Sequence, residues 1–94
     1  MYQIVQTNKF TKSLKRLVGG GLKKSVQKDI QIVIDVIASG KKLAVGYRDH
    51  QLRGKLSDYR ECHIQGDLLL VYQIVDREVV LLLIDLGSHN DIFG

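Results

Sequence analysis

Three histidines and two carboxylates stand where the apolar patterns of this chain are interrupted. His50 lies in a long polar segment, His63 lies at the start of a run of strands, and His89 lies in the C-terminal tail. Glu61 and Asp67 flank His63. Because histidine exchanges a proton near neutral pH, such a set is suited to general acid–base catalysis. For any single histidine, a surface or capping role is the alternative.

The stretch YRECHIQGD, residues 59–67, places Cys62 beside His63 and therefore raises the alternative of a metal site. Successive side chains of a strand point to opposite faces, so these two side chains could not easily share one ion. The same alternation puts Glu61 and His63 on one face, about 6.6 Å apart along the strand. Since no other pair has the spacing of zinc ligands, we expect no metal, and Cys62 should be a small buried residue. An ordinary polar strand face is the third interpretation of this stretch.

The positive charge of the chain, +4 in total, is concentrated in its first two thirds. Residues 1–60 carry thirteen lysines and arginines and four acidic residues, whereas residues 61–94 carry one arginine and six acidic residues. A basic segment of this kind favours a polyanionic partner, with nucleic acid as the first candidate. Two lysine-rich helices with solvated faces would give the same pattern, so charge alone leaves both interpretations open.

Histidines, carboxylates and cations without a metal motif are the groups that metal-free RNA cleavage requires. A base removes the proton from a ribose 2′-hydroxyl, the oxygen attacks the adjacent phosphorus, and an acid protonates the departing 5′-oxygen. Cationic side chains stabilise the charge that builds up on the phosphorane. DNA has no 2′-hydroxyl and could not react in this way.

Apolar periodicity predicts the elements that would hold these residues. Four segments have the composition or alternation of strands, and two have the three- and four-residue spacing of amphipathic helices. The glycines at 19–21 and the pair Ser39-Gly40 end the two helices. The expected strands span residues 1–6, 59–64, 68–75 and 79–86, and the expected helices span residues 8–18 and 22–37.

The resulting order βααβββ predicts one α+β domain over residues 1–94. The two helices should form a hairpin on one face of a small, mainly antiparallel sheet, because short turns join the last three strands. The pattern leaves open where the first strand joins this sheet. Residues 41–58 should be mainly a functional loop, and the tail after residue 86 should be irregular. Some apolar surface should remain on the open face or edge of the sheet.

Four separated blocks of the sequence resemble, in order and spacing, the YafQ branch of the RelE/ParE toxin superfamily. They are YRDHQLRG (47–54), YRECHIQGD (59–67), LLLVY (68–72) and LGSHNDIF (86–93), and the resemblance covers the whole chain. It implies a RelE-like, microbial-ribonuclease-like α+β fold. It also implies the toxin of a type II toxin–antitoxin pair, an endoribonuclease that cuts translated mRNA in the ribosomal A site and inhibits translation.

The resemblance implies the roles of individual residues by matched position. His89 matches a tail histidine that acts as proton donor. His50 and His63 match the remaining histidines, whose general-base and phosphate-contact roles stay undivided here. Asp67 matches a carboxylate that orients a histidine. Phe93 matches an aromatic residue that positions a base, and base stacking is the chemistry that it would use.

Glu61 completes the expected catalytic set and departs from the aspartate of some family members, which alters its reach by one methylene. The basic residues divide into two groups according to their distance in sequence from the histidines. We expect RNA contacts near the scissile bond from Arg48, Arg53, Lys55 and Arg60, and contacts with ribosomal RNA from Lys9, Lys12, Lys15, Arg16, Lys23, Lys24 and Lys28.

The implied partners are a cognate antitoxin, the ribosome and mRNA, with a toxin that is monomeric when free and hetero-oligomeric with the antitoxin. No cofactor is expected. The single cysteine, the lack of a signal-like N-terminus and the lack of an apolar run of about 20 residues predict a soluble, cytoplasmic protein. Two alternatives stay open, namely a non-enzymatic, ParE-like poison of gyrase and an inactive module that binds RNA or antitoxin.

Overall fold

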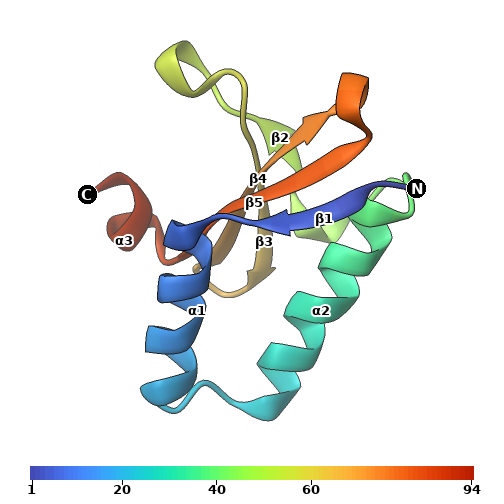
Figure 1. Ribbon diagram of the computed structural model, residues 1–94. Helices are drawn as coiled ribbons and strands as arrows, with labels where there is room; N and C mark the ends of the chain where they lie inside the picture. The colour runs from blue at the N-terminus through green and yellow to red at the C-terminus, as the bar shows by residue number, and fades with distance from the viewer.

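Two long helices pack against one face of a five-stranded sheet in the computed structural model, which describes residues 1–94 (Figure 1). The α+β class and the order βααβββ are confirmed, with one short strand and one short helix in addition. No helix is both long and apolar enough to span a membrane. The elements are β1 (Gln3–Gln6), α1 (Asn8–Gly19), α2 (Lys24–Ala38), η1 (Val45–Tyr47), β2 (His50–Gln51), η2 (Gly54–Leu56), β3 (Arg60–Gln65), β4 (Leu68–Val75), η3 (Asp76–Glu78), β5 (Val80–Gly87) and α3 (His89–Phe93), where η marks a single 3-10 turn.

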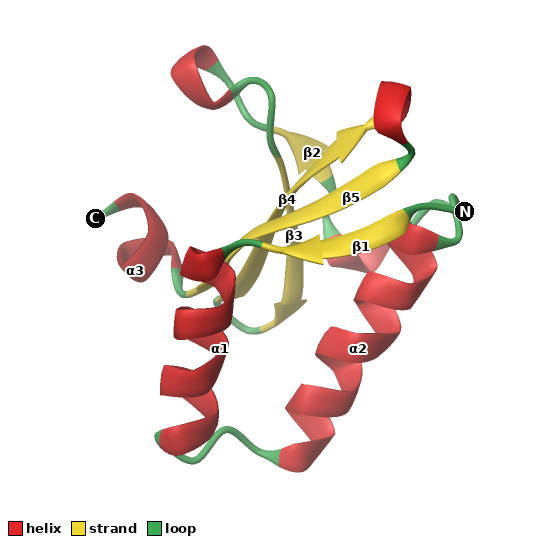
Figure 2. Ribbon diagram, viewed as in Figure 1, coloured by secondary structure: helices red, strands yellow, loops and turns green.

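The strands follow the order β1-β5-β4-β3-β2 across the sheet (Figure 2). β1 runs parallel to β5, with Gln3 opposite Val80, and the remaining pairs are antiparallel. The first strand, whose place the sequence left open, therefore forms one edge, and β2 forms the other. As a result His50 lies on an edge strand and His63 lies on the strand next to it.

The main core lies between the sheet and the two long helices. On β3 and β4 it uses alternate residues, so Cys62 and Ile64 face the helices together with Leu70 and Tyr72. Cys62 is completely buried, as the alternation predicted. The opposite face of the sheet thus receives Glu61 and His63. The buried cluster comprises Phe10, Ile30, Val33, Ile34, Ile37, Ala38, Cys62, Ile64, Leu70, Tyr72, Leu81, Leu83 and Leu86.

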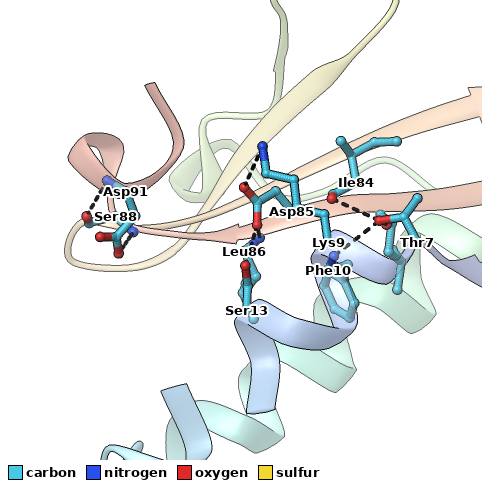
Figure 3. A network of polar contacts seen from close by, with 10 residues as sticks. Thr7, Lys9, Phe10, Ser13, Ile84, Asp85, Leu86, Ser88 and Asp91 are labelled. Atoms are coloured by element: carbon cyan, nitrogen blue, oxygen red, sulfur yellow. Dashed lines mark hydrogen bonds and ion pairs between the residues drawn. The ribbon is translucent and has the colours of Figure 1, made fainter. Parts of the chain in front are cut away.

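A buried carboxylate anchors α1 to β5 (Figure 3). Asp85 is almost fully buried, and its Oδ1 accepts hydrogen bonds from the Ser13 hydroxyl at 2.7 Å and from the backbone N–H of Leu86 at 2.8 Å. Lys9 Nζ lies 3.5 Å from Asp85 Oδ2. A buried charge is tolerated only when it is paired and hydrogen-bonded, and this one is. Lys9 therefore has a structural partner in addition to its proposed contact with RNA.

The sequence predicted most boundaries to within two residues, but one expectation was wrong. The tail is not irregular, because Ser88 caps the short helix α3 through a reciprocal capping box with Asp91. The segment 41–58 is mainly loop, as expected, and contains the two-residue strand β2 and two 3-10 turns. The expectation of exposed apolar surface is met at the edge strand, where Ile4 and Val5 are each more than one third exposed.

The division of the sheet into two faces predicts unequal effects of neighbouring substitutions in β5. Replacing Leu81, which is fully buried beneath the helices, with alanine should lower the free energy of unfolding by about 2–5 kcal/mol. The same change at Leu82, which is half-buried on the other face, should cost less than about 2 kcal/mol. Urea denaturation measures both values, and equal losses would contradict this placement of the core.

Candidate active site

His50 and Glu61 form the closest pair of titratable side chains on the sheet face away from the long helices. The two residues are partners in the β2–β3 ladder, and opposed residues of a ladder point to the same face. His50 Nε2 lies 3.1 Å from Glu61 Oε2. The Glu61 side chain is only 7% exposed, whereas that of His50 is 51% exposed. The carboxylate thus holds a histidine that solvent and a ligand can still reach.

The second ring nitrogen of His50 is also engaged. Nδ1 lies 2.7 Å from the backbone carbonyl oxygen of Arg48. Arg48 has a φ of 50°, a left-handed conformation that a non-glycine residue seldom adopts, and this bend aims its carbonyl back at the ring. Both neighbours of the ring are acceptors, so both contacts are hydrogen bonds only when the imidazole carries two protons. The geometry therefore suits a fixed imidazolium, as a donor or a cation.

His63 differs from His50 because its ring makes no hydrogen bond or ion pair within the protein. It lies two residues after Glu61 on β3 and is half-buried. Sequence alternation correctly placed both residues on one face, but the partner of the Glu61 carboxylate is His50. The ring nitrogens of His63 are consequently free to contact a ligand.

The helix α3 packs on this same face of the sheet. Across the ladders His63 is opposite Leu69, and Leu69 is opposite Gly87, so these three positions point to one side. A Cβ atom on Gly87 would lie 3.0 Å from the Cβ of Asp91, which shows that α3 covers Gly87. A side chain at this position would require Asp91 to move by a few tenths of an ångström. His63 and Gly87 are separated by two inter-strand spacings, about 10 Å.

His89 and Phe93 occupy the first and last positions of α3, and their ring centroids lie 4.9 Å apart at an angle of 46°. The spacing of four residues puts both rings on one side of the helix. The predicted tail histidine and the predicted aromatic residue are therefore brought together. They form a second polar and aromatic group on α3, which covers Gly87 at the end of β5.

The other predicted residues are more widely spread. Asp67 is exposed in the turn before β4, lines a groove with Ser88 and Asp91, and makes no hydrogen bond or ion pair with a histidine. Arg60 points to the side of the helices, where its Nη2 lies 3.0 Å from Asp49 Oδ2. The remaining basic candidates are exposed, and they are Arg48, Arg53 and Lys55 beside β2 and Lys9, Lys12, Lys15, Arg16, Lys23, Lys24 and Lys28 on or next to α1 and α2.

Cys62 is excluded as a nucleophile by its surroundings. Burial raises the pKa of its thiol to about 12, with smaller contributions in the same direction from the charges of Asp49 and Glu61. A thiol in this state carries almost no thiolate at neutral pH. Its role is the apolar one that the sequence predicted.

Sequence reasoning missed four polar residues that support this site. Asp49 precedes His50, and Tyr72 carries a hydroxyl within an apolar run. Neither feature of the sequence predicted that the Tyr72 hydroxyl contacts the Asp49 carboxylate. Ser88 and Asp91 form the Ser-x-x-Asp pattern of a helix N-terminus, which could have predicted α3. Their omission came from treating the tail as too short to form a helix.

A model of the YafQ family, described as the bacterial toxin of a type II toxin–antitoxin system, matches residues 2–94. The chain belongs to the YafQ toxin family. The fold is likewise that of a metal-bound toxin from Helicobacter pylori, with a TM-score of 0.89 and 45% sequence identity over 99% of this chain and 100% of that one.

Two curated YafQ relatives match over shorter stretches. The putative toxin YafQ of Haemophilus influenzae is 58% identical over 38% of this chain and 35% of the relative. The mRNA interferase toxin YafQ of Escherichia coli strain K12 is 35% identical over 51% of this chain and 50% of the relative. The chain therefore matches half or less of the length of these curated proteins.

The similar toxin from Helicobacter pylori is metal-bound, which raises the question whether the side chains of this chain fit a metal. No group of three or more histidine, cysteine, aspartate or glutamate side chains lies close enough to hold an ion. Cys62 and His63 face opposite sides of the sheet, and both ring nitrogens of His50 have partners. The residues present do not fit a resident metal.

The capping box of α3 gives a second prediction. Replacing Ser88 with alanine removes the hydroxyl that accepts the Asp91 N–H at 3.0 Å, so the five-residue helix should fray and release His89 and Phe93. We expect a loss of about 1 kcal/mol in helix stability and faster amide hydrogen exchange in residues 89–93. Ser25→Ala, the same change on the exposed surface of α2, should leave exchange in α3 unaltered.

The cap also has a defined dependence on pH. Hydrogen bonds from the backbone N–H and the hydroxyl of Ser88 hold the pKa of Asp91 below its ordinary value. A lowered carboxyl pKa stabilises the fold above the pKa of the unfolded state, and this stabilisation is lost as the pH falls through the folded pKa. In the wild type, α3 should therefore fray more in acid than at neutral pH. This increase should be smaller in Ser88→Ala, because the variant lacks one of the two hydrogen bonds that lower the Asp91 pKa.

Proposed function

We propose that this chain is an endoribonuclease that cuts mRNA on the translating ribosome. The observation that carries the proposal is the His50–Glu61 pair, which lies on one sheet face with His63, in a chain of the YafQ family whose helix α3 carries the His89–Phe93 pair. A relative in this family is named an mRNA interferase. The exposed basic residues beside β2 suit contacts with the phosphates of an RNA strand.

The contacts of the three histidines support a different catalytic role for each of them. His63, with no partner in the protein, takes the proton of the ribose 2′-hydroxyl, and the freed oxygen attacks the adjacent phosphorus. His50, fixed by Glu61 and the Arg48 carbonyl, presents an imidazolium to the charge that builds up on the phosphorane. His89 protonates the departing 5′-oxygen, which breaks the phosphorus–oxygen bond and leaves a 2′,3′-cyclic phosphate.

The remaining candidates position the RNA. Phe93 stacks on a base beside the scissile bond, and Arg48, Arg53 and Lys55 contact phosphates from the segment around β2. Asp67 orients a histidine once RNA is bound. The basic residues on and next to α1 and α2 contact ribosomal RNA, so binding to the ribosome weakens as salt rises.

The partners in this proposal are the ribosome, its mRNA and a cognate antitoxin. The free toxin is a cytoplasmic monomer, since translation occurs there, and it forms a hetero-oligomer with the antitoxin that prevents entry into the A site. The family description supports the antitoxin, because a type II system pairs a toxin protein with an antitoxin protein.

Mapping of mRNA 5′ ends in cells after brief induction tests the proposal. Cuts in register with codons, confined to translated messages, are the expected result. The same message without a start codon serves as the matched control and should stay intact. Cuts that are independent of translation would contradict the ribosomal step, and accumulation of gyrase–DNA cleavage complexes without mRNA cuts would favour a gyrase poison instead.

A further inference from the structure

Three polar side chains meet on the helix-facing side of the sheet, away from the His50–Glu61 pair. The Asp49 carboxylate accepts hydrogen bonds from the hydroxyl of Tyr72 and from Arg60 Nη2, the latter at 3.0 Å. Arg60 and Tyr72 are partners in the β3–β4 ladder, so the register itself places the two donors side by side. We call this group the Asp49 clamp. None of its contacts involves a histidine directly.

The clamp holds Asp49, the residue between His50 and Arg48, whose carbonyl contacts the His50 ring. The strand β2 consists of His50 and Gln51 alone, and two ladder positions on an edge strand give little hold on the chain. Arg48 also has an unfavourable left-handed backbone, which persists only where the surroundings fix it. The clamp supplies that restraint.

Tyr72 and Arg60 are suited to donate hydrogen bonds to Asp49 over a wide range of pH. The Tyr72 ring is 2% exposed within the core, so the hydroxyl is carried on a rigid support. Burial, followed by the hydrogen bond to Asp49, raises the pKa of Tyr72, and the hydrogen bond to Asp49 raises that of Arg60. Both therefore remain donors across the range in which histidines titrate. Arg60 also neutralises a carboxylate that would otherwise repel a phosphate close to His50.

We propose that Asp49, Arg60 and Tyr72 are positioning residues that fix the His50 ring against Glu61 from the opposite side of the sheet. The inference rests on the proposed function for its effect on RNA cleavage, but its structural claim concerns the free protein. It gives Arg60 a role in holding His50 in place of the direct RNA contact that its sequence position suggested. It also explains why an apolar strand such as β4 contains a tyrosine whose hydroxyl faces away from the proposed RNA surface.

The test compares Tyr72→Phe with Tyr47→Phe. Tyr72→Phe keeps the buried ring and removes only the hydroxyl that holds Asp49. Tyr47→Phe removes a hydroxyl that makes no hydrogen bond in the protein from a ring that also packs against the core. We measure the ring nitrogen and proton shifts of His50 by NMR in the free protein, and ribosome-dependent cleavage of one message. Arg60→Lys and Arg60→Met form a second pair.

We expect Tyr72→Phe to shift or broaden the His50 ring signals and to slow cleavage about tenfold, with a folded protein and unchanged His89 signals. Tyr47→Phe should change neither readout, and Arg60→Lys should retain more activity than Arg60→Met. Unchanged His50 signals in both Tyr72→Phe and Arg60→Met would overturn the clamp. If cleavage falls only in proportion to the unfolded fraction, the clamp is merely structural. If the wild type leaves mRNA intact while the His50 signals respond, the proposed function fails and the clamp stands.

Discussion

Replacing His89 with alanine is expected to abolish growth arrest while the protein stays folded and still binds its antitoxin. In the proposed reaction His89 supplies the proton to the departing 5′-oxygen, and loss of a positioned general acid slows a reaction by about 10²- to 10⁴-fold. The side chain is exposed on α3 and contributes nothing to the main core, so stability should change little. Growth after induction and in vitro cleavage on ribosomes measure the effect.

Two further variants separate proton transfer from ring packing. Asn90→Ala alters the exposed neighbour of His89 and serves as the matched control, which should remain toxic. Phe93→Leu removes the ring that lies 4.9 Å from His89 while keeping an apolar side chain, and it should weaken RNA binding more than the rate of the chemical step. Toxicity retained in a folded His89→Ala protein would remove this residue from the mechanism.

Much of the fold follows from the sequence because local patterns determine it. The strand expected at residues 68–75 has those bounds in the structure, since glycine-containing and acidic turns delimit a continuous apolar run. The first long helix begins at Asn8 as expected, because Thr7 accepts a hydrogen bond from the N–H of Phe10. Alternation was sufficient to separate Cys62 from His63.

The parts that the sequence did not give depend on contacts between distant segments. No local pattern shows that β1 pairs with β5 in parallel, since the partner is almost the whole chain away. A two-residue strand such as β2 has too few positions to show a period. The pairing of Glu61 with His50, in place of its neighbour His63, depends on the β2–β3 register. Residues of the site could thus be named from sequence, but their contacts could not.

The register makes Glu61 the residue whose substitution should have the second largest effect. Glu61→Gln keeps the shape of the side chain and removes the charge that lies 3.1 Å from His50 Nε2. Without a carboxylate the imidazolium loses its charge-assisted hydrogen bond, which is stronger than a neutral one. We expect cleavage on ribosomes to fall about 10²-fold. Glu61→Asp keeps the charge with a shorter reach and should retain an intermediate activity.

Glu78→Gln provides the matched control, because it makes the same change at an exposed position in the turn before β5 and should leave cleavage unaltered. Stability gives an independent readout. Glu61 is buried against His50, so His50→Ala leaves a buried carboxylate without its partner and should destabilise the fold more than Glu61→Gln does. Equal activity of Glu61→Gln and Glu78→Gln would show that the His50–Glu61 contact only supports the edge of the sheet. A selective loss in Glu61→Gln would instead assign the charge of this pair to the chemical step.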